Sequence, residues 1–233
     1  MRVERWRLRS KRALRSDRPR PIALVGVHAP FYIVCEGATD AAFIETLLTN
    51  RGMPTQAFQI GEAEGHTGFQ RHLEALMTSS DRPRLTHLAV VGDNDDVPAE
   101  RFLNIQTALA GVGLPVPGAP STIVAGPPVV GVFMMPSVGL QGTLESLLMD
   151  SVTETQPEVG ACVETFRECI SAPGNWGVSK VAKMRLNATI AACCVGDPSA
   201  SVAYVWGKNG NPIQIGSAVF NPLATFLQQV SAT

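Results

Sequence analysis

Short runs of apolar, β-favouring residues alternate along the chain with longer segments whose apolar residues recur at helical spacing. The apolar runs predict strands at 31–35, 56–60, 85–92 and 129–135. Helical spacing follows them, at 39–52, with Thr39 as the expected cap, at 69–77, at 98–110 and after Thr143. Strands that alternate with helices of this length favour parallel pairing. The pattern therefore predicts an α/β fold: a mostly parallel, four-stranded, Rossmann-like sheet flanked by helices.

The pattern changes twice outside this alternation. Residues 111–128 are rich in Gly and Pro and predict an exposed excursion, with a short edge strand at 122–125. Beyond the fourth strand and its helix the pattern is mostly helical, at about 158–170, 179–194 and 222–230. We therefore expect three parts, which are a basic N-terminal arm at 1–22, an α/β domain at 23–152 and a mostly helical C-terminal extension packed on it at 153–233.

Charge is distributed unevenly along the chain. Apolar residues make up 45% and charged residues 17%, so a sizeable core is expected. The first 20 residues hold nine of the 19 Lys and Arg residues but only two of the 20 Asp and Glu residues, so the rest of the chain is acidic. Such an arm either binds nucleic acid through its phosphates or extends freely into solvent, and the sequence leaves both open.

Several classes of protein are disfavoured by the sequence. No apolar run approaches the roughly 18 residues that span a bilayer, and no apolar signal-peptide core follows the N-terminal charges, so we expect a cytoplasmic protein with no membrane partner. The five cysteines lack the paired spacing of a structural zinc site and are interpreted as packing residues in a reducing compartment.

Carboxylates follow two of the predicted strands at the point where each strand ends. Glu36 comes directly after the first strand, with Asp40 in the next helix, and Asp93, Asp95 and Asp96 follow the third strand. Because the carboxyl ends of parallel strands meet at one edge of a sheet, these side chains are expected to share a crevice. In an extended exit, Asp93 and Asp95 would point the same way. Clustered carboxylates repel unless protons or a divalent cation relieve them, and Mg²⁺ prefers oxygen ligands.

Three segments resemble the Toprim domain, which occurs in topoisomerases, bacterial primases, ribosomal-RNA maturation nucleases and OLD-family nucleases. These are E-G-A-T-D at 36–40, G-D-N-D-D at 92–96, and V-F-M-M-P-S-V-G-L-Q-G-T-L-E-S-L-L at 132–148. The third is similar to the later part of small stand-alone Toprim-like proteins of uncharacterised function. The resemblance covers roughly residues 31–150 and implies the Toprim form of the Rossmann-like fold.

The resemblance implies a role for each matching carboxylate. Glu36 would be the catalytic general acid or base, or would help to position the attacking group, and would lie at the metal. Asp93 and Asp95 would hold Mg²⁺ or Mn²⁺, Asp40 would support the Glu36 loop or the metal shell, and Glu145 would be an additional ligand. Asp96 is a less certain member of the set. Asp93, Asp95 and Asp96 also have a structural alternative as turn residues. For Asp40 and Glu145 the alternative is an anion in the first turn of a helix.

Basic residues open one of the C-terminal helices. Lys180 and Lys183 could contact phosphates if that helix packs near the crevice, and otherwise they form a solvated face. The segments that determine the substrate in the better-known Toprim proteins are missing from this chain. It shows no nucleophilic-tyrosine domain, no primase polymerase body and no phosphate-binding P-loop.

The hypothesis that follows is a small Mg²⁺-dependent nuclease acting on DNA or RNA. The main alternative is a non-catalytic metal- or nucleotide-binding module, or a regulatory subunit of a defence or repair complex whose ATPase is a separate partner chain. A Rossmann-like enzyme acting on a small phosphorylated molecule is a third possibility. The sequence leaves open the substrate, the number of metals and the oligomeric state.

Overall fold

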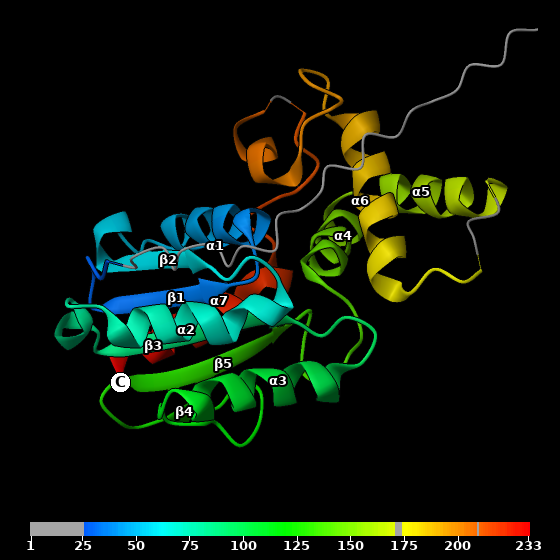
Figure 1. Cartoon of the computed structure of the whole chain (residues 1–233). Coiled ribbons are helices and arrows are strands. Elements are labelled where there is room, and N and C mark those ends of the chain that lie inside the picture. Colours follow the sequence, from blue (N-terminus) through cyan, green and yellow to red (C-terminus); the bar gives the residue numbers. More distant parts are fainter. Residues whose placement is uncertain (1–25, 171–173, 209) are drawn as a thin grey trace, which may run out of the picture.

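A computed structural model describes residues 26–170, 174–208 and 210–233 of the chain, so the predicted arm at 1–22 lies outside the described residues. Its sheet has five strands in the order β2-β1-β3-β5-β4 (Figure 1). The strands are β1 Phe31–Cys35, β2 Phe58–Glu62, β3 His87–Asp93, β4 Ile123–Val124 and β5 Val129–Met135. Strands β2, β1, β3 and β5 are parallel, and β4 runs antiparallel to β5. The mostly parallel α/β sheet is thus confirmed, but four strands was wrong, because the short edge strand joins as a fifth.

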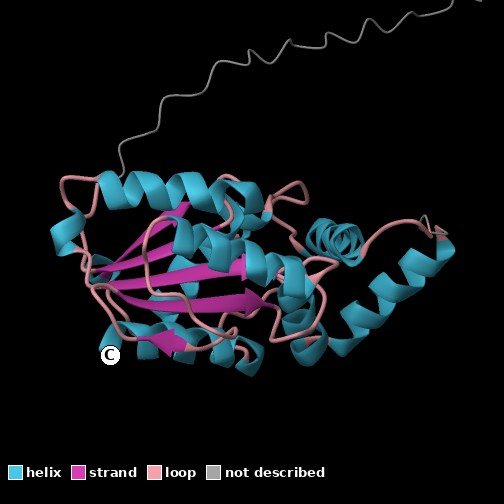
Figure 2. Cartoon of the chain, turned by 60° about the horizontal axis from the view of Figure 1, so that its bottom comes forward, coloured by secondary structure: helices cyan, strands magenta, loops and turns pink. Residues whose placement is uncertain are grey.

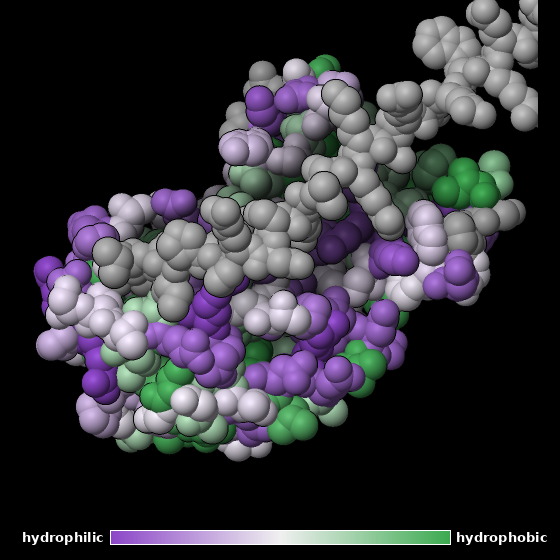
Figure 3. Space-filling view, in the orientation of Figure 1, coloured by the Kyte–Doolittle hydropathy of each residue, from purple (hydrophilic) through white to green (hydrophobic). Residues whose placement is uncertain are grey.

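Helices cover both faces of this sheet (Figure 2). The α-helices are α1 Ala38–Asn50, α2 Phe69–Thr78, α3 Pro98–Gly111, α4 Leu144–Thr155, α5 Pro157–Cys169, α6 Val178–Cys193 and α7 Asn221–Ala232. Side chains of the central strands alternate between two cores: Ile33 and Val91 lie in one with α1 and α7, while Val34 and Val90 lie in the other with α2 and α3. Strands buried on both faces explain the unbroken apolar runs in the sequence. The outer surface of α2 is mainly hydrophilic (Figure 3).

Several predicted boundaries were wrong by one or two residues, and two of these differences bear on the site. Strand β2 begins at Phe58 and ends at Glu62, two residues later than the apolar run suggested. Helix α1 begins at Ala38 with Gly37 as its N-cap, so Thr39 lies inside the first turn. Here Asp40 takes over the capping, since its carboxylate accepts a hydrogen bond from the Gly37 N–H at 3.1 Å.

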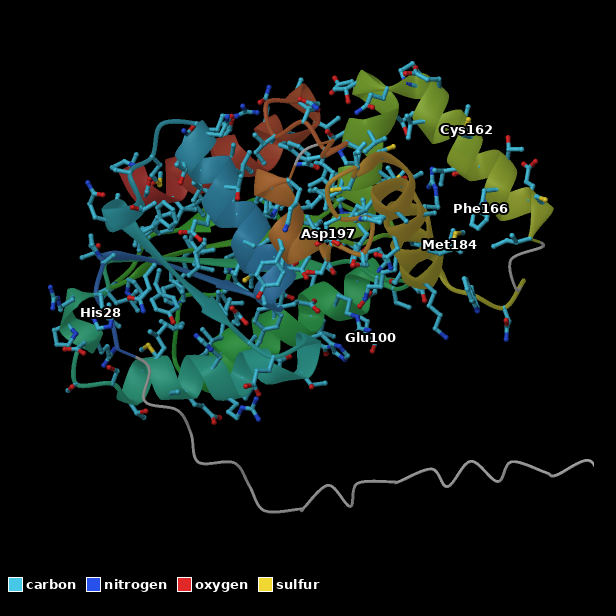
Figure 4. All side chains as sticks on the ribbon, turned by 90° about the horizontal axis from the view of Figure 1, so that it is seen from above. His28, Glu100, Cys162, Phe166, Met184 and Asp197 are labelled. Carbon is cyan, nitrogen blue, oxygen red and sulfur yellow. The ribbon has the colours of Figure 1, made fainter. Side chains whose placement is uncertain are left out.

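The C-terminal segment contributes to the fold in two ways. Helices α5 and α6 pack on α4 beyond the edge of the sheet, and they lie side by side in the view that labels Phe166 and Met184 (Figure 4). The chain then returns through a 3-10 helix, Val202–Gly207, whose Trp206 ring lies 5.7 Å from the ring of Phe43. Finally, α7 packs against β3 and β5. Among the described residues no helix is long and apolar enough to cross a membrane.

Helix α7 is part of the main core, and removing one of its side chains tests this directly. Phe226 is buried, its ring lies 5.5 Å from Phe133, and Gly131 leaves the space that it fills, because a Cβ there would lie 2.7 Å from the Phe226 ring. We expect Phe226→Ala to lower the free energy of unfolding by about 3–5 kcal/mol in urea titration. Exposed Gln229→Ala on the same helix should change it by less than about 0.5 kcal/mol. Equal effects would show that α7 is not core.

Candidate active site

The order of the strands reverses between β1 and β3, so the carboxyl ends of these two strands form the switch point of the sheet. These strands are neighbours, yet the chain leaves β1 into α1 on one face and leaves β3 into α3 on the other. Open α/β sheets bind their ligands at such a point. A pocket of about 400 Å³ lies here. The charged side chains that line it are Glu36, Asp40, Glu62, Glu64, Asp93, Glu145 and Lys183.

The exit of β1 is tied to both neighbouring strands. The Glu36 Oε1 atom accepts a hydrogen bond from the backbone N–H of Asp93, at 3.2 Å. The carbonyls of Cys35 and Glu36 accept hydrogen bonds from the N–H groups of Ala63 and Gly65, both at 2.8 Å. Glu36 is therefore held between the ends of β2 and β3 by contacts on either side.

Asp93 is the last residue of β3 and meets the start of α4. Its Oδ1 atom accepts a hydrogen bond from the backbone N–H of Leu144, the first residue of that helix, at 2.9 Å. The positive end of the helix dipole stabilises a negative charge in this position. The next residue, Glu145, accepts a hydrogen bond from the Thr143 hydroxyl at 2.7 Å. The first turn of α4 thus brings a second carboxylate to the Asp93 pocket.

The carboxylates raise one another's pKa values. Burial is the main cause for Asp93, and the charges of Asp40, Glu36 and Glu145 add to it, so that its pKa lies well above the usual range. Burial raises the pKa of Glu36 to about 7 and that of Asp40 to about 6. Lys183 acts in the opposite direction on the pKa of Asp40. At neutral pH the pocket must therefore hold protons or attract a cation.

The donor set fits Mg²⁺ in its chemistry. All the acidic groups that line the pocket offer carboxylate oxygens, the ligands that Mg²⁺ prefers, and Mg²⁺ keeps several waters that can bridge to them. Within the described part of the chain, no three His, Cys, Asp or Glu side chains converge into a ready-made ion site. Direct ligation by three of these groups would thus require the carboxylates to turn toward the ion.

Asp95 and Asp96 lie outside this pocket. The backbone of Asp95 has φ 48°, so the exit from β3 is not extended, and the expectation that Asp93 and Asp95 point the same way was wrong. Asp95 instead forms an ion pair with Arg101, at 2.9 Å, and accepts a hydrogen bond from the Ser179 hydroxyl, at 2.7 Å. Asp96 accepts a hydrogen bond from the N–H of Val178, at 2.7 Å.

The two candidate lysines also differ in their position relative to the pocket. Both are exposed residues of α6, but Lys183 lines the pocket whereas Lys180 does not. Sequence reasoning overlooked Glu62 and Glu64 altogether. Because β2 ends at Glu62 and not at 60, Glu62 stands at the carboxyl end of a parallel strand, in register with Cys35. A correct end for β2 would have revealed it by the same rule that found Glu36 and Asp93.

Comparison with known proteins identifies a family. A family model described as a protein of unknown function, DUF3226, matches residues 30–201, which include every side chain named at this site. The chain belongs to this family. No curated protein and no solved structure gives a significant match.

Proposed function

We propose that this DUF3226 protein is a Toprim-type enzyme that uses Mg²⁺ to cleave a phosphodiester bond in DNA or RNA. The observation that supports the proposal most is the contact between Glu36 and the end of β3 within a pocket lined by six carboxylates. The pocket lies at the switch point of the sheet, which is where ligands bind in this class of fold. The three sequence segments that resemble Toprim proteins supply the carboxylates Glu36, Asp40, Asp93 and Glu145 of this pocket.

Glu36 is the general acid or base in this proposal. A group that transfers protons works best when its pKa is near the working pH, and burial brings the pKa of Glu36 to about 7. Its carboxylate is fixed by the N–H of Asp93, so one oxygen is oriented while the group exchanges a proton with the attacking water or the leaving oxygen.

Asp93, Asp40 and Glu145 would hold the cation. When bound, Mg²⁺ offsets the charge of the phosphate and polarises its oxygens. The chain's own contribution is to present oxygens from three elements, β3, α1 and α4, and to keep Asp93 oriented through the N–H of Leu144. Asp95, which the Toprim resemblance also assigns to the metal, would have to leave Arg101 to take part.

The charge of the pocket limits what it can bind. With six carboxylates and one lysine among the described lining residues, a phosphate could approach only after a cation has entered. Lys183 is the basic group that could then contact the phosphate. A longer nucleic acid would need further positive charge, and the arm at 1–22 carries nine Lys and Arg residues.

Cleavage of a labelled panel of single- and double-stranded DNA and RNA tests the proposal. We expect cleavage that requires Mg²⁺ or Mn²⁺ and that falls by about 100-fold or more in Glu36→Gln, since general acid–base groups contribute about 10²–10⁴ to rates. Glu100→Gln, an exposed carboxylate in the first turn of α3, is the matched control and should retain the wild-type rate. Metal binding without cleavage of any substrate would instead favour the binding or regulatory module, with an ATPase on a separate chain.

A further inference from the structure

We propose that Asp95 and Asp96 are positioning residues that hold the start of α6 so that Lys183 faces the carboxylate pocket. This rests on the proposed function, because Lys183 is the basic side chain of that site. The four residues Asp95, Asp96, Val178 and Ser179 are called the clasp below. The clasp gives the second half of the G-D-N-D-D segment a role other than direct metal binding.

The clasp supplies a missing helix cap. The N-cap of α6 is Gly177, which has no side chain that could accept from the first N–H groups of the helix. The carboxylate of Asp96, 82 positions earlier in the chain, accepts from the N–H of Val178 at 2.7 Å, and its negative charge favours the positive end of the helix. A Cβ at Gly177 would overlap the Asp96 carboxylate. A side chain at position 177 would thus displace the Asp96 carboxylate from its contact with Val178.

The second contact of the clasp fixes the rotation of α6. The hydroxyl of Ser179 donates to Asp95 Oδ1 at 2.7 Å, while the other oxygen of Asp95 is paired with Arg101 at 2.9 Å. Ser179 and Lys183 are four residues apart and so share one face of the helix. The face that the clasp holds is therefore the face from which Lys183 lines the pocket. Lys180 lies on α6 as well but does not line the pocket.

The loop that carries these aspartates is itself well anchored. The side-chain N–H₂ of Asn94 donates to the carbonyls of Ser137 and Leu140, both at 2.7 Å. The backbone of Asp95 exchanges two hydrogen bonds with Gly142, at 2.8 and 2.9 Å. The same loop thus fixes the segment that enters α4 and the start of α6. The loop thus connects α4, which contributes Glu145 to the pocket, with α6, which contributes Lys183.

Carbodiimide cross-linking of the full-length, metal-free protein tests the position of Lys183. This reagent joins an amine to a carboxylate in contact with it, and mass spectrometry identifies the pair. In the wild type we expect an amide between Lys183 and Asp40 or Glu145. We expect no amide between Lys180 and either of these carboxylates. Asp96→Ala and Ser179→Ala should each lower the yield of this amide by about tenfold or more, since each removes a hydrogen bond to a carboxylate. Glu100→Ala is the control, and circular dichroism checks the fold. An unchanged yield in both clasp variants would overturn the proposal.

Calorimetry with Mn²⁺ separates positioning from metal ligation. Asp95→Ala should bind Mn²⁺ within about threefold of the wild-type affinity, whereas Asp93→Ala should lose most of its affinity. An equal loss in the two variants would make Asp95 a ligand and overturn the positioning role. If the wild type itself does not bind Mn²⁺, the proposed function fails, and the cross-linking result still decides whether the clasp sets the position of Lys183.

Discussion

Asp93→Asn is expected to abolish metal-dependent activity and, in the same protein, to raise the melting temperature. Burial and three neighbouring carboxylates make a charge at Asp93 unfavourable, as the raised pKa of this group indicates. An asparagine keeps an oxygen for the N–H of Leu144 but removes the charge. Loss of a carboxylate ligand should weaken Mn²⁺ binding by more than about 100-fold, which is the upper end of the effect of outer-shell partners. Opposite changes in stability and activity are typical of a functional site.

Differential scanning calorimetry in EDTA measures the first effect and titration calorimetry with Mn²⁺ the second. Each kcal/mol gained should raise the melting temperature by about 2–4 °C in a chain of this size. Asp81→Asn is the matched control, because Asp81 lies outside the pocket and should change neither quantity. A lower melting temperature in Asp93→Asn would mean that the carboxylate serves the fold, and unchanged Mn²⁺ affinity would mean that it does not bind the ion.

The metal-free protein is expected to lose stability as the pH rises toward neutrality. A carboxyl group whose pKa is higher in the folded than in the unfolded state binds its proton more tightly when folded. Its contribution is complete below the unfolded value of about 4 and is lost as the pH rises through the folded value. For Asp40 and Glu36 the folded pKa values are about 6 and about 7, so the loss falls between about pH 4 and pH 7.

Mg²⁺ should reverse this loss, because it binds the deprotonated carboxylates and displaces their protons. The measurement is the melting temperature from pH 4 to pH 8, in EDTA and in MgCl₂. The two curves should diverge as the pH rises, and the difference should shrink in Glu36→Gln, which lacks one of the titrating groups. Curves that coincide over the whole range would contradict a cation site in this pocket.

Much of this site could be predicted from the sequence because the carboxylates follow apolar strands. A buried strand excludes charge from its middle, so Glu36 marks the end of β1 and Asp93 marks the end of β3. Parallel pairing then brings the two ends together. The strands β1 and β5 were predicted with their observed bounds, since unbroken apolar runs define them. Glu62 was missed because polar residues interrupt the apolar run of β2, and its boundary was placed two residues early.

The remaining errors came from contacts between distant segments. The positive φ of Asp95 accompanies its backbone pairing with Gly142, which is remote in sequence, and no local pattern reveals it. The N-terminal contact of α6 with Asp96 is likewise set by tertiary packing. Helix α7 of the expected C-terminal extension covers the sheet beside α1, and the space that Gly131 leaves for Phe226 is likewise not visible in any local pattern.

A crystal structure after soaking with Mn²⁺ shows whether the carboxylate pocket binds a divalent cation, because the anomalous signal locates the ion. We expect an ion in the pocket between β1 and β3, bound by oxygens of Asp93, Asp40 and Glu145 directly or through one water. An ion bound at Asp95 and Asp96 in place of the pocket, or no ion there at saturating Mn²⁺, would contradict it.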